Sequence, residues 1–579
     1  MEELAVPEMR SDAVTDRMKY TIKPSAVRSE NLLHNFKATN GRAFPIQLGQ
    51  EIIFEFPGMG NGYYCDFSTS YFRMGVNCAF TNAIANATLS AAGVTANAVN
   101  QGYMRFDRGL ESIFRRIQIF DASGNLLENF ENYNDLYWAI ELMTNNSTLR
   151  SRMGNFHGEG LLVPHNSENP DASGGMIGAA NDVGGAGLGY FTPAGNPFEV
   201  HVNGYNAQIP YVKYPDLGGI IAGQHCAPIN VTNTANIGTT VDFSNFMQAT
   251  QALPIGTATN TYKYFTFQLL SAMFGGASEK YIPMSAINGL RIVMTLEDPA
   301  GCLVQCGLGL VNNTAATQTA CTTTIYDPTL FLNMVRVDPA VDQALKNTAK
   351  GRDNLIRISS QTWSTYQTSI AANTESFEYL IPIRVSSLKA IYFTFAKQSY
   401  KGLETFQDFL YPHLGTDSKT TWFDNCLLQY QFFLDGKPTP ATPVQVKTGY
   451  SEVISELARS LHIGHKGADG QYLSLLCSGS LADYPCRNFI LGQEFESFNG
   501  KGPVIESGYN TLNSTLTLRL DFDTTGLIKQ PPPAVCVGGN MLPALTQAIT
   551  PIASYLKVFC LYDTFLTIDD STGVMRTEF

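Results

Sequence analysis

Short apolar runs separated by turn residues dominate the first part of the chain. Residues 51–56 form one such run, which ends at Pro57-Gly58. Residues 113–120 form another, and it stops at Asp121-Ala-Ser-Gly124, a turn sequence with Asp first and Gly last. Residues 126–130 are the expected hairpin partner. The same reading predicts further strands over 44–48, 63–79, 262–267 and 290–296.

One helix is predicted between these strands, over residues 134–143. Its apolar positions recur at three- and four-residue spacing and would form one face: Tyr133, Leu136, Tyr137, Ile140 and Met143. Asn134 is the expected N-cap, and Asp135 stands in the first turn. After the helix, residues 150 to about 260 are rich in Gly, Asn and Ala and show weak apolar periodicity, which predicts a long inserted loop.

The second half of the chain repeats the first. Residues 427–434 form a strand that stops at Asp435-Gly436, and a short extended piece at 444–447 follows. Tyr450 then precedes a helix for which Ser451 is the expected N-cap. Strand, Asp-containing turn, strand, Tyr and helix therefore occur twice, with Tyr133 and Tyr450 317 residues apart.

A second pair of matching segments measures the insertion. Residues 264–267, Phe274-Gly-Gly and 290–298 match residues 488–491, Phe498-Asn-Gly and 516–521. Phe274 and Phe498 are 224 residues apart, which is 93 fewer than the separation of the two tyrosines. The first copy therefore carries about that much extra chain between helix and strand, where the Gly- and Asn-rich stretch lies.

These patterns predict an all-β fold of two tandem modules, each a β-sandwich or jelly-roll with a short helix. The expected parts are an N-terminal arm over 1–45, a first module over 46–340 and a second over 341–579. A long loop over about 150–260 is inserted in the first module. The arm is polar and of mixed charge.

Composition narrows the class of protein. The 579 residues are 44% hydrophobic but only 15% charged, which suits a folded, strand-rich protein that buries surface against copies of itself. The net charge of -12 argues against broad binding of DNA. The 11 cysteines are odd in number and scattered, so reduced and mostly buried thiols from a cytosolic or nuclear setting are expected. Neither a secretory signal nor a transmembrane run is evident in the sequence.

Candidate chemistry is sparse. His157, Glu159 and His165 lie close in sequence, His462 and His465 end the second helix, and Cys302 and Cys306 are four residues apart. None of these groups has the spacing or the further ligand of a metal site, so solvent-exposed histidines and plain thiols are the better interpretation. The glycine-rich residues 184–189 neither follow a strand nor open a helix, so they predict a flexible loop. No catalytic, cofactor-binding or metal-binding residue is predicted, and the chain is not expected to be an enzyme.

Three segments resemble one family. Residues 109–134 combine a strand bearing Arg115 and Arg116, a Gly-containing turn, Leu127-Glu128 and Tyr133-Asn134 before a helix. Together with residues 281–298 and the strand at 556–568, this order resembles the major capsid proteins of virophages and polinton-like viruses, in the adenovirus-hexon-like lineage. The resemblance is patchy over roughly 50–568, and it rests on the order of the segments.

The resemblance implies a structural role in a virion, two tandem jelly-roll β-sandwiches in each chain, and a tower formed by the loop inserted at about 150–260. Three chains, each with two jelly-rolls, would form a homotrimeric pseudo-hexagonal capsomer that tiles an icosahedral capsid around a double-stranded DNA genome. The implied partners are neighbouring capsomers and penton or minor capsid proteins, with assembly in the host cytoplasm or nucleus and no sequence-specific binding of the DNA. Alternatives are a minor capsid or spike protein, a tandem β-sandwich carbohydrate-binding protein, and a cupin-type enzyme. The third alternative would need a His/Glu metal motif, which the sequence lacks.

Overall fold

The computed structural model describes most of the chain outside its long loops. The described residues are 29–80, 102–144, 262–274, 281–307, 321–349, 354–400, 402–404, 418–446, 450–461, 489–496, 508–524, 535–537, 540–542 and 550–578. The predicted tower loop at 150–260 lies outside them, as do residues 1–28 of the predicted arm.

The first module is a sandwich of two antiparallel sheets. One sheet has the order β1 (Ser29–Lys37), β12 (Cys321–Val337), β4 (Tyr63–Phe80) and β8 (Lys263–Phe267), with β2 (Ala43–Pro45) on β12 and β9 (Ile282–Pro283) on β4. The other has the order β3 (Glu51–Pro57), β10 (Gly289–Leu296), β6 (Phe114–Asp121) and β7 (Leu126–Glu131). Alternating residues of β3 are buried, as expected for a strand with one face on the core.

The second module repeats this arrangement. Its first sheet contains β13 (Leu355–Ile370), β24 (Ser554–Asp569) and β15 (Leu388–Lys397), with β17 (Trp422–Phe423) and β20 (Leu491–Glu494) paired to β15 and β25 (Val574–Glu578) paired to β24. Its other sheet has the order β14 (Ser376–Leu380), β21 (Leu516–Phe522), β18 (Leu427–Leu434) and β19 (Lys437–Gln445).

The strand order identifies both modules as jelly-rolls. If β1, β3, β4, β6, β7, β8, β10 and β12 are numbered one to eight, the two sheets of the first module read 1-8-3-6 and 2-7-4-5. The second module gives the same order with β13, β14, β15, β18, β19, β20, β21 and β24. Eight strands divided between two sheets in this order form a jelly-roll. The predicted fold class is therefore confirmed from the topology itself.

Each module also carries one helix between its fifth and sixth strands. These helices are α2 (Tyr133–Thr144) and α11 (Ser451–Ser460), at the two positions where the repeat placed them. The predicted N-caps were wrong by one or two residues. Asn134 lies inside the first turn of α2, because the carbonyl of Asn132 already accepts the first backbone bonds. Ser451 is the first residue of α11, and Tyr450 occupies the cap position without a side-chain bond.

The predicted arm also needs correction. Residues 29–45 belong to the first sandwich, since β1 pairs along its length with β12 and β2 pairs with the same strand. Half-buried Leu32, His34 and Phe36 alternate with exposed residues along β1, and the ring of Phe36 packs 5.5 Å from that of Phe56. The strand pattern in this segment was hidden by its polar outer face.

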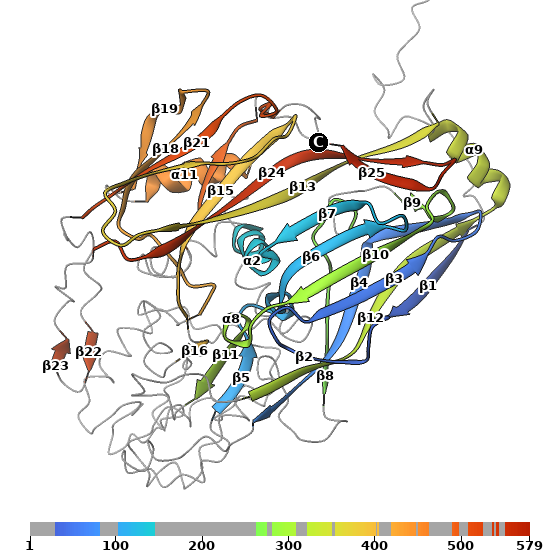
Figure 1. Ribbon diagram of the computed structural model, residues 1–579, viewed down its shortest axis with the longest axis horizontal. Helices are drawn as coiled ribbons and strands as arrows, with labels where there is room; N and C mark the ends of the chain where they lie inside the picture. Colours follow the sequence, from blue (N-terminus) through green and yellow to red (C-terminus); the bar gives the residue numbers. More distant parts are fainter. Residues whose placement is uncertain are drawn as a thin grey trace, which may run out of the picture.

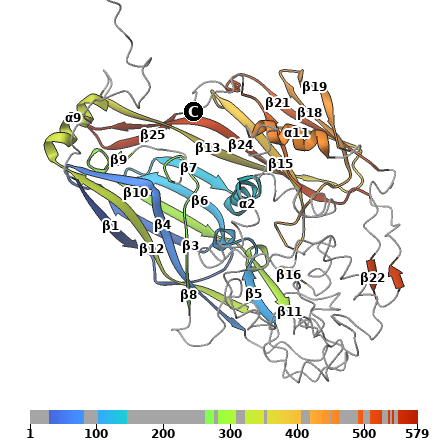
Figure 2. The same ribbon diagram turned by 180° about the vertical axis from the view of Figure 1, so that it is seen from behind.

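The two modules lie against each other along one side (Figures 1 and 2). Helix α9 (Pro339–Ala349) links β12 to β13 at one end of the molecule, so the predicted boundary at residue 340 falls in this linker. Strands β13, β24 and β25 of the second module run past α2, β6 and β7 of the first. Smaller elements complete the described fold: β5 (Gly102–Phe106), α8 (Pro299–Cys302), β11 (Leu303–Gly307), β16 (Leu403–Glu404), β22 (Val535–Val537) and β23 (Asn540–Leu542), with 3-10 turns at Leu110–Ile113 and Met284–Ala286.

Candidate functional site

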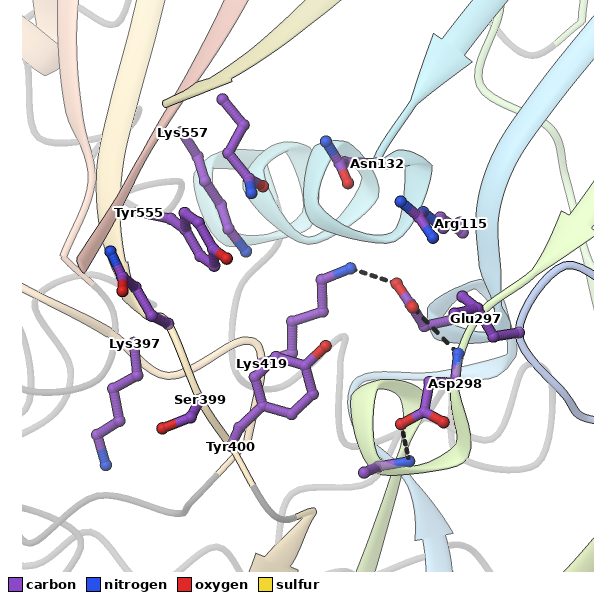
Figure 3. Close-up of a pocket in the computed structure, with 14 residues that line it drawn as sticks. Arg115, Asn132, Glu297, Asp298, Lys397, Ser399, Tyr400, Lys419, Tyr555 and Lys557 are labelled. Carbon is purple, nitrogen blue, oxygen red and sulfur yellow. Dashed lines mark hydrogen bonds and ion pairs between the residues drawn. The ribbon is translucent and has the colours of Figure 1, made fainter. Parts of the chain in front are cut away.

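The most elaborate polar site of the described chain lies at the contact between the two modules, called here the inter-module interface. Lys557 on β24 donates to Asp135 on α2 at 2.6 Å. Lys419, which precedes β17, forms a close contact with Glu297 at the end of β10 and lies 3.6 Å from Asp135. All four side chains are at most 9% exposed. Figure 3 shows Glu297, Lys419 and Lys557 around a cavity of about 380 Å³ between the modules.

Local structure explains how the carboxylates reach this place. Asp135 stands in the first turn of α2, where the unpaired backbone N–H groups of a helix favour negative charge. Glu297 follows directly after the last residue of β10, and one of its oxygens accepts the backbone N–H of Asp298 at 3.0 Å. Asn134 bridges the two elements, because its amide donates to Glu297 at 3.0 Å and to the carbonyl of Ser112 at 3.3 Å.

The charges of this cluster shift each other's pKa. Burial opposes the charged form of Lys419, but Asp135 and Glu297 outweigh burial and hold the pKa of the amine above its usual value. Burial likewise opposes ionisation of Glu297, yet Lys419 and several hydrogen bonds keep its pKa below the usual value. For Lys557 burial is the larger influence, and its pKa is lowered despite the nearby Asp135. The charged forms of Lys419 and Glu297 therefore depend on their neighbours in the cluster.

An aromatic layer lies beside the charges. Trp138 of α2 and Trp422 of β17 are both fully buried, and their ring centres are 6.3 Å apart across the interface. The guanidinium of Arg108 stacks 4.1 Å over the ring of Trp138 and donates to the hydroxyl of Thr420 at 3.0 Å. That hydroxyl in turn donates to Asp107 at 2.9 Å. Aromatic and Arg side chains of this kind contribute most to the stability of interfaces.

A second polar contact lies further along the interface. Glu128 of β7 accepts the backbone N–H of Ala272 at 2.8 Å from its own module and the hydroxyl of Thr362 at 2.9 Å from the other. Burial raises the pKa of this carboxyl. Nearby, Ser360 donates to the carbonyl of Ala272 at 2.7 Å, and Thr577 of β25 donates to that of Leu127 at 2.8 Å. The modules are therefore joined by specific hydrogen bonds as well as by packing.

The backbone crosses the interface too. Strand β11 of the first module pairs in parallel with β16, a short strand from the second half of the chain, with Gln305 opposite Leu403. Asn288 donates to the carbonyl of Thr572 at 2.8 Å next to β25. Hydrogen bonds at three separate places, together with a buried ionic cluster, hold the two jelly-rolls in one relative position.

The residues considered for metal binding in the sequence do not come together in the described structure. Cys302 is buried in α8, and burial raises the pKa of its thiol. Cys306 lies in β11, while His157, Glu159, His165, His462 and His465 fall outside the described residues. Within the described ranges, no group of three or more His, Cys, Asp or Glu side chains could hold a metal ion. The described part of the chain also contains no helix long and apolar enough to cross a membrane. Five cysteines with described side chains form no disulfide, and all but Cys426 are buried: Cys65, Cys78, Cys302, Cys426 and Cys560.

Sequence reasoning missed the ionic cluster, although two signals pointed to it. Lys557 interrupts the apolar run Leu556-Lys-Val-Phe-Cys-Leu561, which is unusual for an exposed lysine. Asp135 stands within a helix whose other residues are mostly apolar. Lys419 carries no such signal, because its surroundings in sequence are polar.

No protein-family model matches the sequence, and no curated protein matches it. Among solved structures, VP54 of PBCV-1, fitted into a reconstruction of the virophage Sputnik, is similar over 97% of this chain and 99% of its own, with 11% identity and a TM-score of 0.49. A cryo-EM structure of the Sputnik virophage matches over 100% and 93%, with 12% identity and a TM-score of 0.49. The mavirus major capsid protein matches over 100% and 95%, with 8% identity and a TM-score of 0.40.

These comparisons concern the fold. The strand order alone defines the chain as a tandem jelly-roll protein, and the similar structures extend over nearly its whole length.

Proposed function

We propose that the chain is a major capsid protein that assembles into the shell of a virion and is not an enzyme acting on other molecules. The carrying observation is that two jelly-rolls of identical strand order are fixed to each other by a buried interface within one chain. The similar solved structures, mavirus and Faustovirus major capsid proteins among them, agree with this proposal.

The assembly that suits this architecture is a homotrimer. A closed ring of three chains uses one heterologous interface per subunit, and it would place six jelly-rolls around one axis. Six similar modules around an axis fill a hexagonal position in an icosahedral lattice, beside neighbouring capsomers and penton or minor capsid proteins. A fixed inter-module geometry is required for this, because a hinged pair of modules would not tile regularly.

The charge of the chain suits a wall around double-stranded DNA. A net charge of -12 allows the protein to enclose the genome without binding it broadly. The low share of charged residues, 15%, favours large contacts between subunits, because the cores of interfaces are depleted in charge. The expected location is the capsid, after assembly in the host cytoplasm or nucleus.

The deciding experiment is the native mass of the full chain, measured by size exclusion with light scattering and followed by negative-stain imaging. The proposal expects a peak near three times 63.4 kDa, hexagonal particles, and shells on concentration. A monomer that persists at high concentration and across salt would contradict it. Small oligomers that bind in a glycan screen would instead favour the carbohydrate-binding alternative. Trimers that never form shells would favour a minor capsid or spike protein.

A further inference from the structure

Lys419, Asn134 and Glu297 of the inter-module interface bring an amine, a carboxamide and a carboxylate into contact. The amine of Lys419 lies 3.2 Å from the side-chain oxygen of Asn134. Glu297 contacts both groups, since one of its oxygens accepts from the Lys419 amine and, at 3.0 Å, from the Asn134 amide nitrogen. A nucleophilic nitrogen, a carboxamide and a carboxylate able to move protons between them therefore share one place.

The reacting side chains are largely buried and the amide is activated. Asn134 is 3% exposed, Glu297 4% and Lys419 9%, and Glu297 and Lys419 line the cavity between the modules. The oxygen of the Asn134 side chain also accepts the backbone N–H of Asp135 at 2.9 Å. This N–H and the N-terminal turn of α2 stabilise the negative charge that an attacked carbonyl develops on its oxygen.

We propose that Lys419 and Asn134 form an amide bond that links the two modules covalently, with Glu297 as the proton-transferring catalytic residue. Glu297 first takes a proton from the Lys419 ammonium. The neutral amine then attacks the side-chain carbonyl carbon of Asn134, forming a carbon–nitrogen bond and a tetrahedral intermediate. Glu297 returns the proton to the original amide nitrogen, whose bond to carbon breaks. With the second proton of the attacking amine, the nitrogen leaves as ammonium, and no oxidant or further reactant is needed.

The resting charges make this a slow reaction. Asp135 and Glu297 hold Lys419 in its ammonium form, so only a small fraction of the amine is neutral at any moment. The close contact between Lys419 and Glu297 supplies the route by which the proton leaves. The link is therefore expected to accumulate after folding, and it requires the two modules to be docked.

Lys557 is placed for a different role. It pairs with the carboxylate of Asp135, which is a poor electrophile while ionised, whereas Lys419 faces a neutral amide. By neutralising Asp135, Lys557 reduces the pull of that carboxylate on the Lys419 proton. The amide bond would close a loop of 285 residues within one chain. Its formation does not depend on how the chain assembles with other copies.

The test is mass spectrometry of the purified full chain. After prolonged incubation of the folded protein, we expect an intact mass lower by one ammonia and a branched peptide that contains both Asn134 and Lys419. The branched peptide is decisive, because a succinimide at any asparagine gives the same loss of mass. Folded chain in which the two peptides remain separate would overturn the proposal.

Variants assign the roles. Lys419→Arg keeps the positive charge but has no reactive amine, so the branched peptide should be absent. Glu297→Gln keeps a hydrogen bond to Asn134 but cannot carry the proton, so formation should slow by about 100-fold or more. Lys397→Met is the matched control: Lys397 lines the same cavity but points away from Lys419 and Glu297 in Figure 3, and the link should form at the normal rate.

If these substitutions disturb folding, the wild-type chain can be compared in its unfolded and refolded states instead. Wild-type chain held in denaturant should keep its full mass, and the same sample after refolding should acquire the branched peptide over time. Equal formation in both samples would mean that the docked geometry plays no part, and it would overturn the proposal as well.

Discussion

Helices α2 and α11 occupy the same position in two modules of the same topology, yet they differ in burial. Every position of α2 from Tyr133 to Met143 is buried except the half-buried Ile140, whereas α11 buries only one face. With Tyr133 aligned to Tyr450, the fully buried Trp138 corresponds to the exposed Ser455. The second module covers α2, and no described element covers the outer face of α11. The position of a module in the pair, and not its fold, therefore decides which of its faces becomes apolar.

The strongest way to test this comparison is to truncate the aromatic side chain that α11 lacks. Trp138→Ala should lower the free energy of unfolding by about 3 to 5 kcal/mol, because it removes a large ring packed between Trp422 and Arg108. Ser455→Ala, at the matching position, should change it by less than about 0.5 kcal/mol. Urea denaturation followed by tryptophan fluorescence measures both. Similar losses in the two variants would mean that α2 has no special role at the interface.

A smaller effect concerns a carboxyl that only the first module has. Glu128 is buried with a raised pKa, and the position that corresponds to it under the same alignment is Gln445. Between the usual pKa of Glu, about 4.3, and the raised value, the folded state binds a proton that the unfolded chain has released. Stability should therefore fall as pH rises through this window.

Glu128→Gln, which gives the first module the residue of the second, should flatten that part of the pH profile and raise stability at neutral pH by on the order of 1 kcal/mol. Thermal unfolding from about pH 4 to pH 8 measures this. Glu297 should change stability with pH in the opposite direction. Its lowered pKa contributes stability above about pH 4.3, and this stability is lost as pH falls further. An unchanged slope in Glu128→Gln would show that Glu128 does not titrate in this range.

The smallest expected effect is one that the two modules share. Arg291 lies opposite Glu55 on neighbouring strands of the first module, and Arg519 lies opposite Glu378 at the matching place in the second. Both arginines are about half exposed, so Arg291→Ala and Arg519→Ala should each cost about 0 to 1 kcal/mol. Denaturation midpoints of the two variants should agree. A clear difference would mean that one of these outer faces is covered in solution.

Much of the fold could be predicted from sequence because its signals are local. Apolar alternation predicted β3, β6, β10, β18 and β21, and the Asp-containing turns predicted the hairpins on either side of residues 121–124 and 435–436. The repeat then predicted two similar modules, which the shared strand order confirms. The half-polar edge strand β1 escaped, because only one of its faces packs against the sandwich.

The inter-module interface could not be predicted in the same way. Asp135, Glu297, Lys419 and Lys557 lie in four separate segments, and their pairing depends on how the modules dock. A charged residue inside an apolar run, such as Lys557, indicates a buried partner but does not say which one. Prediction of such a site therefore requires the relative position of two folded modules, which no local pattern contains.

The jelly-roll order has a consequence for how the chain folds during synthesis. In both modules the first strand pairs with the last, β1 with β12 and β13 with β24. Ser29 therefore cannot pair until Val337 has been synthesised, and Leu355 cannot pair until Asp569 has been synthesised. Contacts this distant in sequence form slowly, and the apolar inner faces of the early strands stay open until the closing strand leaves the ribosome. The entropy of closing a loop grows only with the logarithm of its length, so the longer span of the first module costs a few tenths of a kcal/mol more. Extra chain between these strands is therefore inexpensive at equilibrium, and its main cost is the time during which an unfinished sheet is exposed to aggregation.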